Sequence, residues 1–185
     1  MEDAQIVELY WQRDERAIEE TDRKYGRYCH AVALNLLSVP EDAEECVSDT
    51  WQEAWGSMPA ARPERLRPWL GRVVRNLAVD RYRRARAQKR YGGMETLLSE
   101  LDECVPAAGS VEDALEAKAL GEVIDGWLRS LRAADRALFV RRYFDGARLK
   151  DLAAESGEGA GALAKRMHRL RLALRAALEQ EGITL

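Results

Sequence analysis

The stretch LRPWLGRVVRNLAVDRYRRARAQKR, residues 66–90, gives the clearest indication of how this chain folds. Its apolar residues recur every three or four positions and so predict one amphipathic helix. They are Leu66, Leu70, Val73, Val74, Leu77 and Ala78. Residues 62–90 hold eleven Arg and Lys against two acids, whereas the whole chain has a formal net charge of −3. Positive charge concentrated on one helix favours a polyanion, because its side chains replace the counterions of a phosphate backbone. Nucleic acid is therefore the first partner that the sequence predicts.

The composition as a whole predicts an all-α protein. Ala, Leu, Arg and Glu dominate the 185 residues, and these residue types favour helices. Alternating apolar and polar stretches, which would predict strands, are absent from the sequence. The longest apolar stretch, residues 31–37, is far shorter than the roughly 20 residues that span a bilayer. The acidic N-terminus also lacks the features of a secretory signal, so we expect a cytoplasmic protein without membrane association.

The cysteines and histidines give no indication of a cofactor. Cys29, Cys46 and Cys104 are an odd number without a Cys-x-x-Cys pair, which argues against a disulfide framework and against a zinc site. Cys29 and Cys46 lie among apolar neighbours, so we predict that they are core residues. The sequence also lacks a phosphate loop, a dinucleotide fingerprint and a nucleophile motif. We therefore expect neither a metal nor a cofactor, and no enzymatic activity.

Charge and the positions of glycine and proline divide the chain into segments. Residues 1–61 carry fourteen acids and five bases, residues 94–125 nine acids and one base, and residues 128–175 twelve Arg and Lys against five acids. Such asymmetry predicts separate surfaces with separate partners. Gly92-Gly93 and the Pro and Gly of residues 106–110 interrupt regular structure. We predict two small helical domains, at residues 1–91 and 111–185, joined by a flexible acidic linker at residues 92–110.

An acidic helix is predicted ahead of the basic one, in the sequence DAEECVSDTWQEAW at residues 42–55. Its polar residues lie apart from its apolar ones; they are Asp42, Glu45, Asp49, Gln52 and Glu53. Such a surface is either a solvated helix face or a docking surface for a basic partner, and the spacing alone does not decide between the two. Gly56, Pro59 and Pro63 then predict a loop from residue 56 to residue 67.

The basic helix and its preceding loop offer side chains suited to DNA. Arginines grip phosphates, whereas Asn and Asp read base edges or hold an arginine in place. The residues that we predict to point outward are Arg67, Arg72, Arg75, Asn76, Asp80, Arg83 and Arg84.

The C-terminal half contains a predicted helix-turn-helix. Residues 149–157 fit a first helix that ends at a glycine, and residues 160–178 fit a longer second helix. In such a motif the second helix enters the major groove of DNA. The side chains that this helix is predicted to present are Lys165, Arg166, His168, Arg169 and Arg171.

Two long motifs in the N-terminal half resemble the bacterial extracytoplasmic-function (ECF) sigma factors. The first is Asp42-Ala43-Glu44-Glu45-x-Val47-x-Asp49-Thr50-Trp51-x-x-Ala54-Trp55. The second is Trp69-Leu70, then Arg75-Asn76-Leu77-Ala78-Val79-Asp80-Arg81-Tyr82-Arg83-Arg84. Their order and spacing are those of the family, which is a much more specific signal than a short pattern. Residues 128–182 resemble the same family, including Lys165-Arg166-Met167-His168-Arg169-Leu170-Arg171.

The resemblance implies a transcription initiation factor built from a sigma region 2 bundle and a sigma region 4 helix-turn-helix. In that family the acidic helix binds the β′ clamp helices of core RNA polymerase, which assigns this role to Asp42, Glu45, Asp49, Gln52 and Glu53. The loop and basic helix hold the melted promoter −10 strand, with Asn76 and Asp80 at matching positions. The second helix of the helix-turn-helix reads the −35 element near the β flap. An anti-sigma protein, common in the family, is a further partner that the resemblance allows.

Two other classes of protein fit parts of the sequence. A helix-turn-helix repressor would explain the C-terminal half but not the acidic and basic helices, and an acidic-basic adaptor would predict no promoter-specific transcription. The turn also departs from the family, since Glu158 stands where an apolar residue usually follows the glycine. Gly159 and Gly161 loosen the start of the second helix, because glycine within a helix costs up to about 1 kcal/mol.

Overall fold

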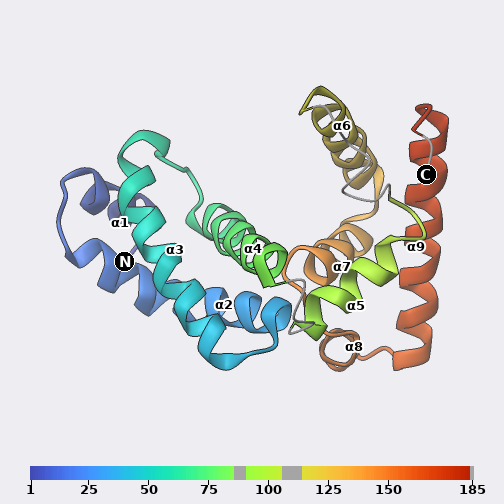
Figure 1. Cartoon of the computed structure of the whole chain (residues 1–185), viewed down its shortest axis with the longest axis horizontal. Coiled ribbons are helices and arrows are strands. Elements are labelled where there is room, and N and C mark those ends of the chain that lie inside the picture. Colours follow the sequence, from blue (N-terminus) through green and yellow to red (C-terminus); the bar gives the residue numbers. More distant parts are fainter. Residues whose placement is uncertain (86–90, 106–113, 184–185) are drawn as a thin grey trace. The chain divides into compact units, whose positions relative to one another are not determined.

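The computed structural model describes residues 1–85, 91–105 and 114–183, with residues 114–116 described by their backbone alone. Residues 86–90 of the predicted basic helix and residues 106–110 of the predicted linker lie outside these ranges. The described residues form helices and turns without any strand, which confirms the all-α prediction. The chain divides into two compact units, Met1–Met94 and Glu95–Leu185 (Figure 1). None of the described helices is long and apolar enough to cross a membrane.

The N-terminal unit contains four helices before residue 86. They are α1 (Asp3–Trp11), α2 (Arg16–Leu37), α3 (Pro40–Ala61) and α4 (Leu66–Ala85). Helices α2, α3 and α4 pack against one another, and α1 covers α2 and α3 (Figure 1). The basic helix α4 buries Leu66, Leu70, Val74 and Ala78, which lie one turn apart. This spacing leaves the rest of α4, including most of its charge, at the surface.

Helix α3 extends further than predicted, so the expected loop is wrong over residues 56–61, whereas the predicted start of the basic helix at Leu66 is confirmed. The helix runs to Ala61 through Pro59, although proline lacks the N–H that would bond to the carbonyl of Trp55. Arg13 replaces that donor, because its Nη1 lies 2.6 Å from the Trp55 carbonyl oxygen. A side chain that is distant in sequence therefore supports the helix at its proline, and α4 then begins at Leu66.

A single carboxylate connects three helices of the N-terminal unit. Asp3, at the start of α1, accepts hydrogen bonds from Lys24 Nζ and from the Tyr25 hydroxyl of α2, each at 2.6 Å. Its other oxygen accepts the backbone N–H of Leu66 at 3.0 Å, the first residue of α4. A helix N-terminus favours such an anion, because its first N–H groups have no partner within the helix. Burial opposes ionisation of Asp3, but the bonds from Lys24, Tyr25 and Leu66 outweigh it and lower the pKa of the carboxyl group.

The predicted linker at residues 92–110 is wrong for its first part, which forms α5 (Gly92–Leu101). Gly93 lies against the end of α2 and donates its N–H to Ser38 Oγ at 3.0 Å. A Cβ atom at this position would lie 2.0 Å from the carbonyl oxygen of Asn35. Only glycine fits at position 93, because the two backbones approach each other closely there. Gly93 therefore serves helix packing, and we were wrong to interpret it as the start of a linker.

The C-terminal unit begins within α5, and its described residues form four further helices. They are α6 (Ala114–Ser130), α7 (Ala133–Tyr143), α8 (Leu149–Ser156) and α9 (Ala160–Gln180). Helices α6, α7 and α8 each pack against α9 (Figure 1). Helix α8 ends at Gly157, whose φ of 70° suits glycine, and α9 follows after a short turn. These two helices confirm the predicted pair and its glycine-containing turn.

The acid Glu100, predicted to lie in a solvated linker, instead anchors α5 in the C-terminal unit. Its carboxylate accepts two hydrogen bonds from Arg142, at 2.5 and 3.1 Å, and one from the Tyr143 hydroxyl at 2.9 Å. Arg142 also donates to the carbonyl of Ala147 at 2.9 Å. A buried guanidinium requires such partners, because its charge is otherwise left without compensation.

Cys29 and Cys46 are fully buried, which confirms that they are core residues. Burial raises the pKa of the Cys29 thiol to about 12 and that of the Cys46 thiol to about 11. Both thiols are therefore protonated at neutral pH, and protonated thiols are poor nucleophiles.

We predict that Gly93→Ala destabilises the protein, while Gly92→Ala does not. The first substitution forces a methyl group onto the Asn35 carbonyl, and such overpacking costs about 1–3 kcal/mol. A Cβ atom at Gly92 meets nothing within 4 Å, so this neighbouring variant is a matched control. Urea unfolding followed by tryptophan fluorescence measures the difference. Equal stability of the two variants would contradict the close approach.

We also predict that Asp3→Asn lowers stability by about 1–3 kcal/mol near neutral pH, since hydrogen bonds to a charged group are lost. The pKa of Asp3 is lowered on folding, so its contribution is complete above the unfolded value of about 4. It disappears as the pH falls from there through the folded pKa. The difference between wild type and variant should therefore be constant from about pH 5 to pH 8 and shrink below about pH 4. A difference that persists undiminished in acid would refute this role.

Candidate protein-binding and nucleic-acid interfaces

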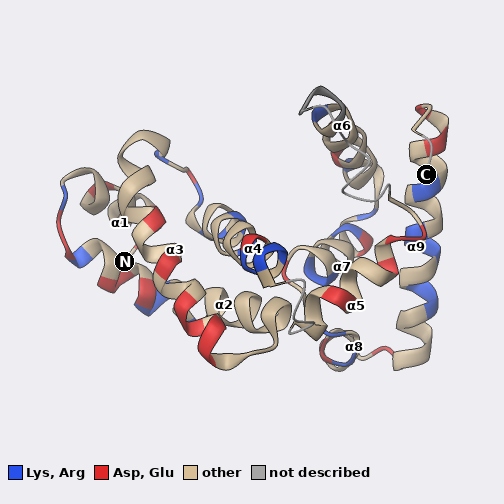
Figure 2. Ribbon diagram, in the orientation of Figure 1, with Lys and Arg blue, Asp and Glu red and all other residues tan. Residues whose placement is uncertain are grey.

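Acidic residues follow one another along α3 (Figure 2), and the predicted acidic surface of this helix is largely exposed. Glu45, Gln52 and Glu53 are exposed, whereas Asp42 and Asp49 are half-buried. Asp42 accepts a hydrogen bond from the Tyr91 hydroxyl at 2.8 Å. The five predicted residues thus share one helix but differ in how freely they can meet a partner.

Two of these acids are bound by the basic helix itself, through a residue that we did not predict. Arg81 of α4 donates Nη1 to Glu45 at 2.9 Å and Nη2 to Asp49 at 2.5 Å. Burial works against the charge of Arg81, but its hydrogen bonds to Asp49 and Glu45 prevail and raise the pKa of the guanidinium. An ion-pair cluster therefore joins the basic helix α4 to the part of α3 that carries Glu45 and Asp49.

An open groove of about 910 Å³ runs along the other side of α3, between it and α2. Its lining residues are Glu15, Ile18, Glu19, Asp22, Ser48, Trp51, Gln52 and Trp55. Trp51 and Trp55 are half-buried, so the groove combines aromatic surface with three acids from the α2 side. These three acids were missed in the sequence analysis. Their spacing of four and three residues places them on one helix face and was the signal that could have identified them.

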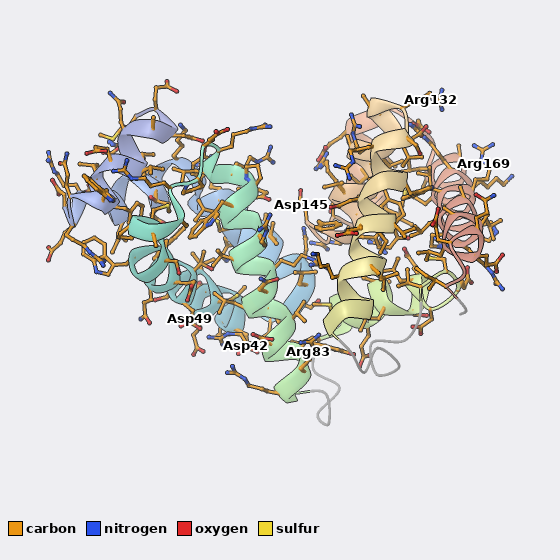
Figure 3. All side chains as sticks on the ribbon, turned by 90° about the horizontal axis from the view of Figure 1, so that it is seen from above. Asp42, Asp49, Arg83, Arg132, Asp145 and Arg169 are labelled. Carbon is orange, nitrogen blue, oxygen red and sulfur yellow. The ribbon has the colours of Figure 1, made fainter. Side chains whose placement is uncertain are left out.

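The basic helix α4 exposes most of the side chains that were predicted to contact DNA. The exposed ones are Arg67, Arg72, Asn76, Asp80, Arg83 and Arg84. Arg72, Asn76 and Asp80 lie four residues apart and so form one row along the helix. The guanidinium of Arg67 stacks 4.5 Å from the ring centroid of Tyr28. Arg83 lies at the C-terminal end of the helix (Figure 3), its Nη1 3.8 Å from the Asp80 carboxylate.

Arg75 does not point outward as predicted. Its side chain is half-buried, and burial lowers the pKa of its guanidinium. It precedes the fully buried Ala78 by three residues, so its side chain lies beside the packed face of α4.

The second helix of the helix-turn-helix exposes three of its five predicted residues. Lys165, His168 and Arg169 surround a shallow depression of about 740 Å³ that also includes Ala162 and Ala164. Arg169 lies on the outer side of α9 (Figure 3). This part of α9 is accessible and positively charged.

Arg166 is held within the unit, contrary to the prediction that it is presented outward. Its guanidinium contacts Asp135 of α7 at 2.7 Å and Glu158 of the turn at 2.5 Å. Burial opposes the charge of Asp135, but hydrogen bonds from Arg166 and Arg132 outweigh it and lower the pKa of the carboxyl group. Glu158, which departs from the family pattern, therefore has a structural partner.

Arg171 also faces inward. Its side chain is 13% exposed, and its Nη1 donates to the Tyr143 hydroxyl at 3.1 Å and lies 3.8 Å from the Glu100 carboxylate. The prediction that Arg171 is presented for base reading is wrong in this respect. The contacts with Tyr143 and Glu100 indicate that it connects α9 to α7 and α5.

Comparison with known proteins identifies the family to which the chain is related. The sigma-70 region 2 family matches residues 22–88. The ECF RNA polymerase sigma factor SigL of Mycobacterium tuberculosis is 30% identical over 156 residues, covering 82% of this chain and 83% of SigL. The ECF RNA polymerase sigma factor RpoE of Cereibacter sphaeroides is 29% identical over 164 residues, covering 88% of this chain and 84% of RpoE. A solved structure of CnrH in complex with the cytosolic domain of CnrY covers 96% of this chain and 97% of its own, at 20% identity and a TM-score of 0.41.

The chain belongs to the family of ECF RNA polymerase sigma factors. Its role is therefore that of a sigma factor in transcription initiation, as the sequence motifs predicted. Within the part of the chain that the structure describes, no group of His, Cys, Asp and Glu side chains is arranged to hold a metal ion.

We predict that Arg171→Gln destabilises the C-terminal unit by about 1–3 kcal/mol, because Glu100 and Tyr143 lose a charged partner. Arg169→Gln should change stability by less than about 0.5 kcal/mol, since this arginine is exposed. Hydrogen exchange of α5, α7 and α9 measures both effects in the intact protein. Faster exchange in Arg169→Gln than in Arg171→Gln would show that the inward and outward assignments are reversed.

Proposed function

We propose that this sigma factor binds core RNA polymerase through α2 and α3, holds the melted −10 strand through α4, and reads the −35 element through α9. The observation that carries the proposal is the separation of surfaces within the N-terminal unit. An acidic, aromatic groove lies between α2 and α3, while α4 exposes a row of arginine, asparagine and aspartate. One surface suits a basic protein, and the other suits a single strand of DNA.

For the polymerase we propose that a basic helix, supplied by the β′ clamp, lies along the groove and the acidic face of α3. Trp51 and Trp55 provide aromatic anchors of the kind that dominate protein interfaces. Glu19 and Asp22 on one side, and Asp49 on the other, would steer and orient the basic side chains of the partner. Asp42, Glu45, Gln52 and Glu53 complete the proposed contact.

For the −10 element we propose that Asn76 and Asp80 contact bases of the opened strand. Arg67, Arg72, Arg83 and Arg84 would neutralise its phosphates, while Arg75 supports the helix from its half-buried position. Holding an extruded base must offset a few kcal/mol of lost stacking, so binding favours the melted state. The factor would thus open the promoter by binding alone, without covalent chemistry of its own.

For the −35 element we propose that α9 enters the major groove and presents Lys165, His168 and Arg169. Arg166 and Arg171 would act indirectly, since their contacts with Asp135 and Tyr143 fix α9 against the rest of the unit. We place this unit near the β flap of the polymerase.

We further propose that an anti-sigma protein restrains the factor by covering the groove between α2 and α3, which would prevent core binding.

We predict that the double substitution Glu45→Lys and Asp49→Lys abolishes binding to purified core polymerase, because it reverses two charges at the proposed contact. The matched control is Glu122→Lys with Asp125→Lys, an equal charge change on two exposed residues of α6. Fluorescence anisotropy of labelled factor titrated with core gives the affinities. The control should bind within about threefold of wild type, since exposed substitutions away from an interface change little. Unchanged affinity of the α3 variant would refute the assignment.

We predict that Asn76→Ala impairs promoter opening by about tenfold while changing core affinity less than twofold, since a good base contact is worth about 1–3 kcal/mol. Permanganate reactivity of unpaired thymines reports the opening, and Gln12→Ala, an exposed change on another surface, serves as control. Equal loss of core binding and opening would count against a role at the −10 strand.

A further inference from the structure

We infer that Arg81 is a positioning residue for polymerase binding. It holds the carboxylates of Glu45 and Asp49 in the arrangement that the polymerase contacts, although it belongs to the DNA-facing helix α4. The inference rests on the proposed function of α3 and adds to it a residue that the sequence did not assign to polymerase binding.

The two acids need a third group to hold them. Glu45 and Asp49 lie four residues apart on α3, so their carboxylates are neighbours on one helix face and repel each other. Long exposed side chains also keep considerable rotamer freedom, which a partner must remove on binding. The planar guanidinium of Arg81 contacts both carboxylates through different nitrogen atoms, at 2.9 and 2.5 Å. The guanidinium of Arg81 therefore offsets the repulsion between the two carboxylates and fixes both side chains.

The position of Arg81 is itself set by the packing of α4 on α3. It follows Ala78, which is fully buried, by three residues, and its side chain is only 21% exposed. Where α3 and α4 pack together, the Cys46 thiol of α3 donates to the carbonyl of Val74 of α4 at 3.6 Å. Because the helices are fixed there, the guanidinium approaches the acids from a defined direction.

Both acids keep capacity for a partner while Arg81 is bound. Each uses one oxygen for Arg81, Oε2 of Glu45 and Oδ2 of Asp49, and their side chains are 69% and 42% exposed. The cluster of two carboxylates and one guanidinium retains one net negative charge. A basic side chain of the polymerase can therefore bind the outer oxygens without displacing Arg81.

Two opposing effects decide what removal of Arg81 does. Immobilising one flexible side chain weakens an association about twofold to tenfold, and here two side chains are held in advance. The added negative charge of an unpartnered acid pair acts at exposed positions, where solvent and salt reduce its influence. Preorganisation should therefore prevail, and loss of Arg81 should weaken core binding.

The test is a double-mutant cycle on the affinity of the full-length factor for purified core, measured without DNA. We expect Arg81→Gln to weaken binding about fivefold to tenfold and Arg81→Lys to lose less, because lysine keeps the charge but lacks the fork. In the background of Glu45→Gln with Asp49→Asn, Arg81→Gln should cause less than about a twofold further loss. Arg27→Gln, an exposed arginine on α2, is the matched control for removal of a positive charge.

The possible results distinguish the inference about Arg81 from the proposal that α3 binds core polymerase. Equal loss in both backgrounds would mean that Arg81 acts through general stability. Unchanged binding would mean that it makes no net contribution, and tighter binding would mean that it competes with the polymerase. Each of these results overturns the inference alone. If Glu45→Gln with Asp49→Asn leaves core affinity unchanged, the proposed role of α3 fails as well. Far-ultraviolet circular dichroism of each variant, before titration, confirms that it is folded.

Discussion

Packing of α4 against α2 and α3 determines where the charged surfaces of the N-terminal unit lie. Leu66, Leu70, Val74 and Ala78 turn one side of α4 inward, so Arg72, Asn76 and Asp80 can form a row on the outside. The same packing brings Arg81 onto Glu45 and Asp49 of α3. Asp3 accepts the first N–H of α4 and ties it to α2. A helix held in this way can present a fixed set of side chains to an opened strand, which a mobile segment could do only at a cost in ordering entropy.

Arginine content does not measure the charge that is available to DNA. In the N-terminal unit Arg75 is half-buried and Arg81 is paired with acids. In the C-terminal unit Arg166 and Arg171 support α9 from within, through Asp135 and Tyr143. These residues stabilise the scaffold, whereas exposed side chains such as Lys165 and Arg169 remain free to approach a phosphate. The division explains how a chain with net negative charge can carry two basic helices.

The sequence predicted the helices well because the spacing of apolar residues is a local signal. The predictions were wrong where a segment distant in sequence determines the local structure. Pro59 did not end α3, because Arg13 donates to the Trp55 carbonyl. Gly93 did not mark a linker, because the end of α2 lies against it. Arg166 and Arg171 were mistaken for exposed residues for the same reason, since the acids that they contact, Asp135 and Glu100, are remote in sequence.

The most direct test of separate surfaces for polymerase and DNA is site-specific photocrosslinking within an open promoter complex. A photoreactive amino acid at position 51, in the groove, should crosslink to the largest polymerase subunit, and one at position 76 should crosslink to the non-template strand of the −10 element. Crosslinks at position 51 to DNA, or at position 76 to protein alone, would contradict the account.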